Sequence, residues 1–304
     1  MEFKDIEYVC AIAEHKSITK AAEALFITQP TLSQYVKNMQ RRLGIHLFCY
    51  EGNRILLTHE GELFVLEGMK LLCDRDTLIN SLNNSQKTGH GLLKLAIPLG
   101  RGSYLLPKVL PAFRALYPHA QVKLTEGSSR ELVSLVKEGF CDVVVINMPS
   151  FPLPIHCETL GYEKMLLVMS RESPYASAVT YNSQDQAQVQ LSHLAEAPFI
   201  LHQAYQHTGQ IERCIFKNAG IKPRIILETK NLEASYRLAA GGYGLTFLSE
   251  YHIHRIMQDD ETINCQVADP ITSMELIVGY RQKGELSFLA QEFIRVLRSE
   301  FSLM

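Results

Sequence analysis

Two short helical patterns follow each other with almost no connection in residues 17–44, SITKAAEALFITQPTLSQYVKNMQRRLG. The first covers 18–25, and its small alanines allow a neighbouring helix to approach closely. Thr28 is suited to cap the second helix, because its side-chain oxygen can accept a hydrogen bond from a free backbone N–H. Pro30 falls in the first turn, where its missing N–H is tolerated, and Gly44 is suited to end the helix. The spacing predicts a helix-turn-helix after a helix over 3–14.

The second helix of this pair has one apolar and one polar face. Apolar residues recur over 32–43 at i, i+4, i+7 and i+11, which predicts a buried stripe. The stretch 26–43 contains three basic residues and no acid, whereas residues 1–90 contain 10 Lys or Arg and 11 Asp or Glu. Such a polar face suits base edges and phosphates in a DNA major groove, although a solvated helical hairpin would show the same pattern. The outward-facing side chains are Gln29, Thr31, Ser33, Gln34, Lys37 and Arg41.

The next residues, LFCYEGNRILLTHEG (47–61), predict a wing. Two short strands over 47–50 and 55–58 flank the turn Glu51-Gly52-Asn53. Arg54, near the tip, can enter a minor groove or bind a phosphate. Thr58 then caps a long helix over about 59–82, which is either a dimer seam or a plain linker. We therefore expect a winged helix-turn-helix domain over 1–58 and a linker or dimerisation segment over 59–90.

Composition narrows the protein class. The formal net charge is −2, so any affinity for nucleic acid must come from a local basic patch. The first ten residues, MEFKDIEYVC, do not resemble a secretory signal, and we find no run of 18 apolar residues. Seven scattered cysteines without a CxxC pair indicate free thiols in a reducing compartment. We therefore expect a cytoplasmic protein without a membrane span.

Three motifs taken together resemble the LysR-type transcriptional regulators. They are A-A-x-x-L-x-x-T-Q-P-T-L-S-Q, then L-G-x-x-L-F, then L-T-x-x-G after the wing. Two departures from the family pattern are Tyr50, where an Arg suited to a phosphate is usual, and Met39-Gln40, where Leu-Glu is usual. The resemblance implies binding to double-stranded promoter DNA as a homodimer, often as a dimer of dimers. The residues that it places on DNA are Thr28, Gln29, Pro30, Thr31, Ser33, Gln34 and Lys37, with Arg54 from the wing.

After residue 90 the pattern changes to alternating strands and helices. We predict a strand over 93–97, a glycine loop over 98–103 and a helix over 104–117. A strand over 121–126, a helix over 129–138 and a buried strand over 143–146 follow. This order predicts a mostly parallel, Rossmann-like α/β sheet.

A weak internal repeat predicts two such lobes. Residues 123–146 share a strand–cap–helix–Gly–strand rhythm with a segment 102 positions later, in which Ser129 matches Asn231 as a helix cap. Two similar lobes form a cleft where strand carboxyl ends and helix amino ends converge. The LysR resemblance implies the same arrangement, a two-lobe effector domain like the periplasmic binding proteins. We place it at 91–304, with lobe I over about 91–161 and 267–304 and lobe II over about 162–266.

The cleft is expected to bind a small effector. A helix amino end favours an anion, and Arg101 with two histidines suggests a carboxylate or a similar group. A loop arginine is, however, more often a solvated surface charge than a ligand-binding group. The candidate effector-binding residues are Gly100, Arg101, Gly102, Ser103, Ser128, Ser129, His202, Gln203, His207, Thr208, Asn231 and Thr246.

The sequence gives little support for a cofactor, metal or redox site. A dinucleotide fingerprint beginning at Gly100 fails at Leu105, and His252-x-His254 lacks further ligands at metal spacing, so we expect neither a cofactor nor a metal. Cys214 is expected to be a buried apolar thiol without a redox role. The favoured function is an effector-controlled DNA-binding regulator. A ligand-blind DNA-binding protein, or an enzyme or transport receptor with two lobes, remains an alternative.

Overall fold

The computed structural model describes residues 1–52, 54–84, 89–256, 261–267, 273–282 and 286–302. Asn53 of the expected turn and residues 85–88 of the expected linker lie outside the described residues. The chain divides into two compact units, residues 1–88 with 138–140, and residues 89–137 with 141–304. Each unit is described by itself.

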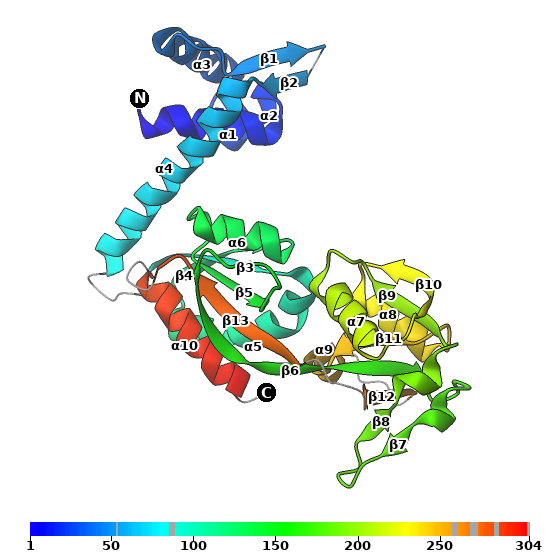
Figure 1. Ribbon diagram of the computed structural model, residues 1–304. Coiled ribbons are helices and arrows are strands. Elements are labelled where there is room, and N and C mark those ends of the chain that lie inside the picture. Colours follow the sequence, from blue (N-terminus) through cyan, green and yellow to red (C-terminus); the bar gives the residue numbers. More distant parts are fainter. Residues whose placement is uncertain (53, 85–88, 257–260, 268–272, 283–285, 303–304) are drawn as a thin grey trace. The chain divides into compact units, whose positions relative to one another are not determined.

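The first unit has the order helix, helix, helix, hairpin, helix (Figure 1). The predicted helix-turn-helix and two-stranded wing are confirmed. Thr28 Oγ1 accepts a hydrogen bond from the Thr31 backbone N–H at 3.4 Å, and Gly44 ends the helix with a left-handed φ of 70°. The elements are α1 (Phe3–His15), α2 (Ile18–Ala24), α3 (Gln29–Leu43), β1 (Phe48–Glu51), β2 (Arg54–Leu57) and α4 (His59–Asn84).

The apolar face of α3 packs in the core of this unit. Leu32, Val36 and Met39 are buried against Val9 and Ile12 of α1. The apolar period of 3.6 residues therefore decides which face of α3 is buried and leaves its polar face outside. Each fully buried leucine or isoleucine contributes about 1.5–3 kcal/mol relative to exposure.

The second unit contains all the remaining elements. In lobe I, α5 and α10 cover one face of the sheet and α6 covers the other. The strands are β3 (Gly91–Ile97), β4 (Ala120–Glu126), β5 (Val143–Asn147), β6 (His156–Ser170), β7 (Thr180–Tyr181), β8 (Ala187–Val189), β9 (Pro198–His202), β10 (Arg224–Thr229), β11 (Thr246–Ser249), β12 (Thr262–Val267) and β13 (Ser273–Tyr280). The helices are α5 (Leu99–Leu116), α6 (Ser129–Lys137), η1 (Ala176–Ala178), η2 (Leu191–Leu194), α7 (His207–Asn218), α8 (Leu232–Ala240), α9 (Glu250–Ile256) and α10 (Phe288–Ser302).

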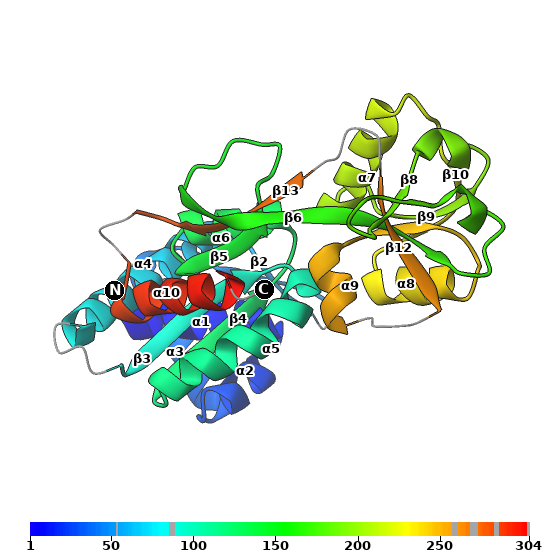
Figure 2. The same ribbon diagram turned by 90° about the horizontal axis from the view of Figure 1, so that it is seen from below.

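Strand β6 joins the two lobes, as Figures 1 and 2 show. Its residues 156–164 pair with β13 in lobe I, and its residues 165–170 pair with β11 and β12 in lobe II. The sheet order is β4-β3-β5-β13-β6-β12-β8-β7, with β11 also on β6 and with β9 and β10 as a separate parallel pair. The expected lobe boundary at 161/162 thus falls inside a continuous strand.

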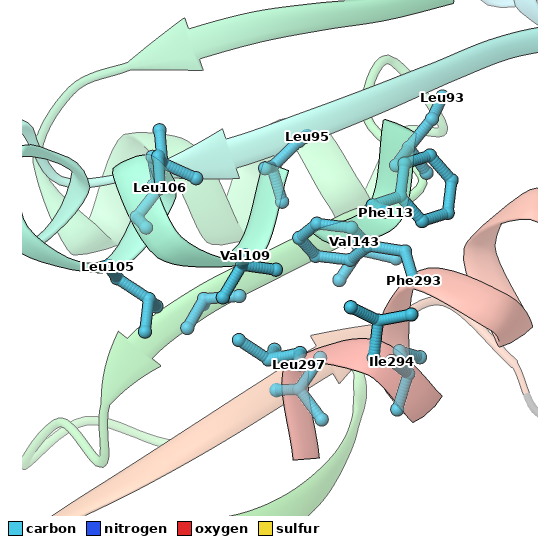
Figure 3. Packing of buried hydrophobic residues seen from close by; sticks show 14 of the residues in the cluster. Leu93, Leu95, Leu105, Leu106, Val109, Phe113, Val143, Phe293, Ile294 and Leu297 are labelled. Atoms are coloured by element: carbon cyan, nitrogen blue, oxygen red, sulfur yellow. The ribbon is translucent and has the colours of Figure 1, made fainter. Parts of the chain in front are cut away.

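The core of lobe I shows why the strand over 143–147 is apolar throughout. Val143 and Val145 face α5 and α10, where Phe113 and Phe293 pack edge to face with ring centroids 5.6 Å apart (Figure 3). The alternate residues Val144 and Ile146 face α6. Both faces of the strand are covered by helices, which explains its apolar sequence. The sheet is mixed, so the prediction of a mostly parallel sheet is wrong: β5 pairs parallel with β3 but antiparallel with β13, and β6 pairs antiparallel with β13, β11 and β12.

Three boundaries in the second unit differ from the sequence prediction. Residues 99–103 form the first turns of α5 and not a glycine loop, because the Arg101 and Gly102 N–H groups both donate to the Pro98 carbonyl. The cap of α6 is Ser128 and not Ser129, since Ser128 Oγ accepts from the Glu131 N–H at 3.4 Å. Helix α7 begins at His207, two residues earlier than expected. Within the described residues, no helix is both long and apolar enough to cross a membrane.

Candidate functional site

The polar face of α3 is open to solvent. Thr28, Gln29, Pro30, Thr31, Gln34, Lys37 and Arg41 are exposed, and Ser33 is half-buried. The hydroxyls of Thr28 and Thr31 lie 2.7 Å apart, and Gln34 Nε2 donates to Asn38 Oδ1 at 3.0 Å. Arg54 is exposed on β2, opposite Glu51 in the hairpin register. The structure therefore brings the predicted α3 residues together on one face.

The third basic residue of α3 has a structural partner. Arg42 Nη2 lies 2.9 Å from Oδ2 of Asp5, a wholly buried carboxylate at the start of α1. Tyr35 also donates to Asp5, at 3.0 Å. Burial alone would raise the pKa of Asp5, but the Glu2 backbone N–H, Tyr35 and Arg42 together hold it below its usual value. Arg42 thus fixes α3 against α1 and is not free for another ligand.

The second unit contains a cavity of about 620 Å³ between its lobes. Five helices begin at its wall among the described residues, namely α5 and α6 from lobe I and α7, α8 and α9 from lobe II. Hydroxyl, amide and imidazole groups in the first turns of these helices form the polar side of the cavity. Its apolar wall is formed by Leu99, Met165, Leu232, Leu248 and Met274.

A buried ion pair lies at this cavity. Arg101 Nη2 is 2.5 Å from Glu163 Oε1, and the side chains are 7% and 0% exposed. Arg101 also donates to Asn147 and to Tyr104, while Asn147 Nδ2 donates to Glu163 Oε1 at 2.9 Å. Burial would raise the pKa of Glu163, but Arg101 and Asn147 lower it below its usual value, so the pair is charged on both sides.

Two histidines at the same cavity are neutral. Burial lowers the pKa of His207 to about 4, and the Arg101 charge acts in the same direction. Burial also lowers the pKa of His252 to about 4. Within the described residues, neither ring nitrogen of His252 has a hydrogen-bond partner, nor has Nε2 of His207. Buried polar atoms without partners are uncommon and call for an explanation.

Two protein families match this chain. The family described as "Bacterial regulatory helix-turn-helix protein, lysR family" matches residues 3–62, and "LysR substrate binding domain" matches residues 86–302. The chain belongs to the LysR family of transcriptional regulators. The predicted fold class, a winged helix-turn-helix followed by a two-lobe effector domain, is confirmed by these matches and by the fold.

Relatives and solved structures agree with this assignment. The uncharacterised regulator YwbI of Bacillus subtilis is 28% identical over 98% of this chain and 96% of its own length. The transcriptional activator CmpR of Synechocystis is 27% identical over 96% and 93% of the two chains. CbnR, a LysR-family regulator solved with its target DNA, superposes with a TM-score of 0.71 at 20% identity, covering 99% of this chain and 100% of its own.

Eight of the twelve predicted effector-site residues of this LysR-type chain line the cavity. Arg101 is one of them, but its charge is balanced by Glu163, which corrects the expectation that it supplies a free positive charge. His207 is another, but it is neutral. The residues that line the cavity are Gly100, Arg101, Ser103, Ser128, Ser129, His207, Thr208 and Asn231.

Four predicted residues, Gly102, Gln203, His202 and Thr246, are not in the cavity wall. Gly102 borders a separate hollow beside α5. Gln203 lies just past the end of β9, where its N–H donates to the Thr229 carbonyl.

His202 and Thr246 are wholly buried. Thr246 Oγ1 donates to the Ile200 carbonyl at 2.8 Å, so it holds β9 and β11 together. His202 contacts Glu212 through Nδ1 at 2.6 Å and Ser235 through Nε2 at 3.0 Å. Both residues are therefore committed to contacts inside lobe II.

Sequence reasoning missed the most polar part of the cavity wall. Tyr104, Asn147, Glu163 and His252 were not expected there. Glu163 offered one usable signal, a carboxylate two residues before the apolar run MLLVM in a strand. A buried strand acid needs a cationic partner.

Cys214 was expected to be buried, and this prediction is wrong. The thiol is exposed, because the buried face of α7 is formed by Glu212, Ile215 and Phe216. The helical period places Cys214 outside this face.

Proposed function

We propose that this LysR-type regulator binds promoter DNA in a sequence-specific way and that a small anionic effector in the cavity between its lobes controls this binding. The observation that carries the proposal is the exposed polar face of α3, which contains Lys37 and Arg41 and no acid. Its DNA target would place the protein in the cytoplasm.

The residues proposed to meet DNA divide into two groups. Gln29, Thr31 and Gln34 have donors and acceptors that suit base edges in a major groove. Lys37, Arg41 and the wing residue Arg54 suit phosphates, which supply affinity without sequence information. Thr28, Pro30 and Ser33 complete the face. The capping bond of Thr28 also fixes the first turn of α3 in place.

We propose a homodimer joined through α4, which can pair further into a dimer of dimers. Several large apolar side chains of α4 are exposed, which a single copy leaves unexplained. A two-fold symmetric dimer would read half-sites about 10 bp apart or a multiple of that. The exposed residues are Leu63, Leu66, Met69, Leu71, Leu78 and Ile79.

The anionic character of the effector is supported by the helix ends at the cavity. Helices α5 and α7 have no acid in the first turn and no side-chain cap, so their partial positive charge is not offset locally. By contrast, α6 is capped by the Ser128–Glu131 pair and α8 by Asn231. An anion placed between the ends of α5 and α7 would contact lobe I and lobe II together. It would therefore favour one relative arrangement of the lobes, as an effector must.

We also propose that the chain is not an enzyme. Ser235, His202 and Glu212 are joined in the order of a hydrolase triad, but all three are wholly buried. Ser235 Oγ donates to the Leu232 carbonyl at 2.8 Å, so its proton is not offered to His202. A catalytic serine must donate its hydroxyl proton to the histidine, and Ser235 donates it to a backbone carbonyl instead.

The test is selection of DNA fragments from the source genome by the purified protein, followed by sequencing. The Gln29→Ala/Lys37→Ala variant is the comparison, and Lys217→Ala, an exposed lysine in the other unit, is the matched control. We expect a dyad-symmetric site that the wild type and Lys217→Ala enrich and the double variant does not. Lack of enrichment by folded wild type would contradict the proposal. A site whose occupancy no small molecule alters would favour the ligand-blind alternative.

A further inference from the structure

We propose that the anionic effector binds together with a proton, which is taken up by the two histidines at the cavity, His207 and His252. This inference rests on the proposed effector function and adds its regulation: binding of the anion tightens as the pH falls. It also restricts the effector class to small anions, which should bind in preference to their uncharged analogues.

The first step is the position of the two rings. His207 is the first residue of α7 in lobe II, at one of the two uncapped helix ends. His252 lies on α9, with its ring edge to face against Tyr104 of α5 at 5.8 Å between centroids. Both residues border the same cavity, so an anion held there is close to both imidazoles.

The second step is the unused bonding capacity of these rings. Within the described part of the chain, His252 Nδ1, His252 Nε2 and His207 Nε2 have no hydrogen-bond partner. A neutral imidazole has one donor and one acceptor nitrogen, whereas an imidazolium has two donors. Next to an anion the imidazolium form is favoured, because both nitrogens can then donate and the two charges attract.

The third step is the balance of charge already present. Arg101 is paired with Glu163 at 2.5 Å, so its charge is already balanced, and Lys230 in the same wall has its Nζ over the Tyr205 ring, 5.6 Å from the centroid. A second negative charge brought into this site therefore needs a new positive charge close by. Burial keeps both histidines neutral without ligand, with pKa values lowered to about 4, so a proton is available to be gained.

The groups that surround the two rings come from several elements. The charges of Arg101 and His202 lower the proton affinity of His252, while that of Glu163 raises it. Arg101 and Glu163 act on His207 in the same two directions. Lys230 and Glu233 complete the charged part of the wall, and Glu233 is paired with Arg237 at 2.8 Å. An added anion acts in the direction of Glu163 and raises both pKa values.

The sign of the pH dependence follows by linkage. If the complex holds one more proton than the free protein and ligand, the affinity rises up to about tenfold for each pH unit of decrease. The effect operates between the pKa of the free histidine and the higher pKa in the complex.

The experiment uses the full chain and a panel of small carboxylates, each paired with its uncharged carboxamide. Thermal stabilisation at pH 7.5 and pH 6.0 identifies binders. The tightest carboxylate is then titrated by calorimetry in phosphate and in Tris, whose different ionisation enthalpies reveal the number of protons taken up. We expect proton uptake, about tenfold tighter binding at the lower pH, and loss of both in His252→Gln or His207→Gln. His193→Gln, an exposed histidine in lobe II, is the matched control.

Each other outcome has a definite meaning. A carboxylate that binds without proton uptake, or carboxamides that bind as well as their acids, would overturn the proton-coupled mechanism and leave the effector function intact. Stabilisation by none of the compounds would overturn both. The calorimetric proton count uses wild-type protein, so it decides the question even where a histidine variant does not fold.

Discussion

Glu163→Gln tests the importance of the buried ion pair at the cavity. The substitution leaves Arg101, which is 7% exposed, beside neutral Asn147, Tyr104 and the new amide. Removing one partner of a buried pair costs about 3–5 kcal/mol, because the remaining charge is desolvated without compensation. For a unit of roughly 200 residues each kcal/mol lowers Tm by about 2–4 °C, so the expected decrease is about 6–20 °C.

The assay is differential scanning calorimetry of the full chain at pH 7.5, with the double variant Arg101→Met/Glu163→Met alongside. Replacing both charges by apolar side chains of similar size removes the unpaired charge, so the double variant should be more stable than Glu163→Gln. Because the folded pKa of Glu163 is lowered, its contribution is present above the unfolded pKa and is lost as the pH falls through the folded value. A decrease below about 2 °C for Glu163→Gln would refute the claim that the pair is desolvated.

Three further substitutions test the local arguments. Asp5→Asn is expected to destabilise the first unit by about 1–3 kcal/mol in urea unfolding, because it removes the buried negative charge that is paired with Arg42. This difference should shrink in acid, since the folded pKa of Asp5 is lowered and its contribution is lost as the pH falls through that value. Phe26→Gly is expected to stabilise the first unit by up to about 1 kcal/mol, because Phe26 has a left-handed φ of 55° that glycine adopts without strain. The side chain is 96% exposed, so its removal sacrifices little apolar burial. A decrease of stability in the same assay would contradict this. Gly209→Ala places a Cβ 2.3 Å from the Gln203 carbonyl oxygen, so we expect the free energy of unfolding to fall by about 1–3 kcal/mol. We also expect weaker stabilisation by the effector, measured as the ligand-induced shift in Tm. An unchanged Tm of the variant would show that the start of α7 adapts freely.

The fold of the first unit could be predicted because the sequence features that specify it are local. The caps at Thr28 and Gly44 and the buried stripe of α3 depend on residues within one or two turns of one another. The clamp between Asp5 and Arg42 was not predicted, since these residues are 37 positions apart and nothing in the local pattern links them.

The cavity was predictable only in outline. Alternating strands and helices indicated which loops meet, and Asn231 was recognised as a cap from its place in the repeat. The pairing of Arg101 with Glu163 depends on two strands and a helix that meet only in the folded chain, across 62 positions. The burial of His202 was missed for the same reason, because its partner Glu212 lies on the facing helix α7.

The salt dependence of binding to the selected DNA site tests the central claim most directly. Removing one protein–phosphate interaction lowers the slope of log K against log salt by about 0.9, so Lys37→Gln should lower it by about 1.8 in a dimer, while Lys217→Gln should not change it. This result would place the basic face of α3 on the DNA backbone. An unchanged slope for Lys37→Gln, with the protein folded and dimeric, would contradict the account.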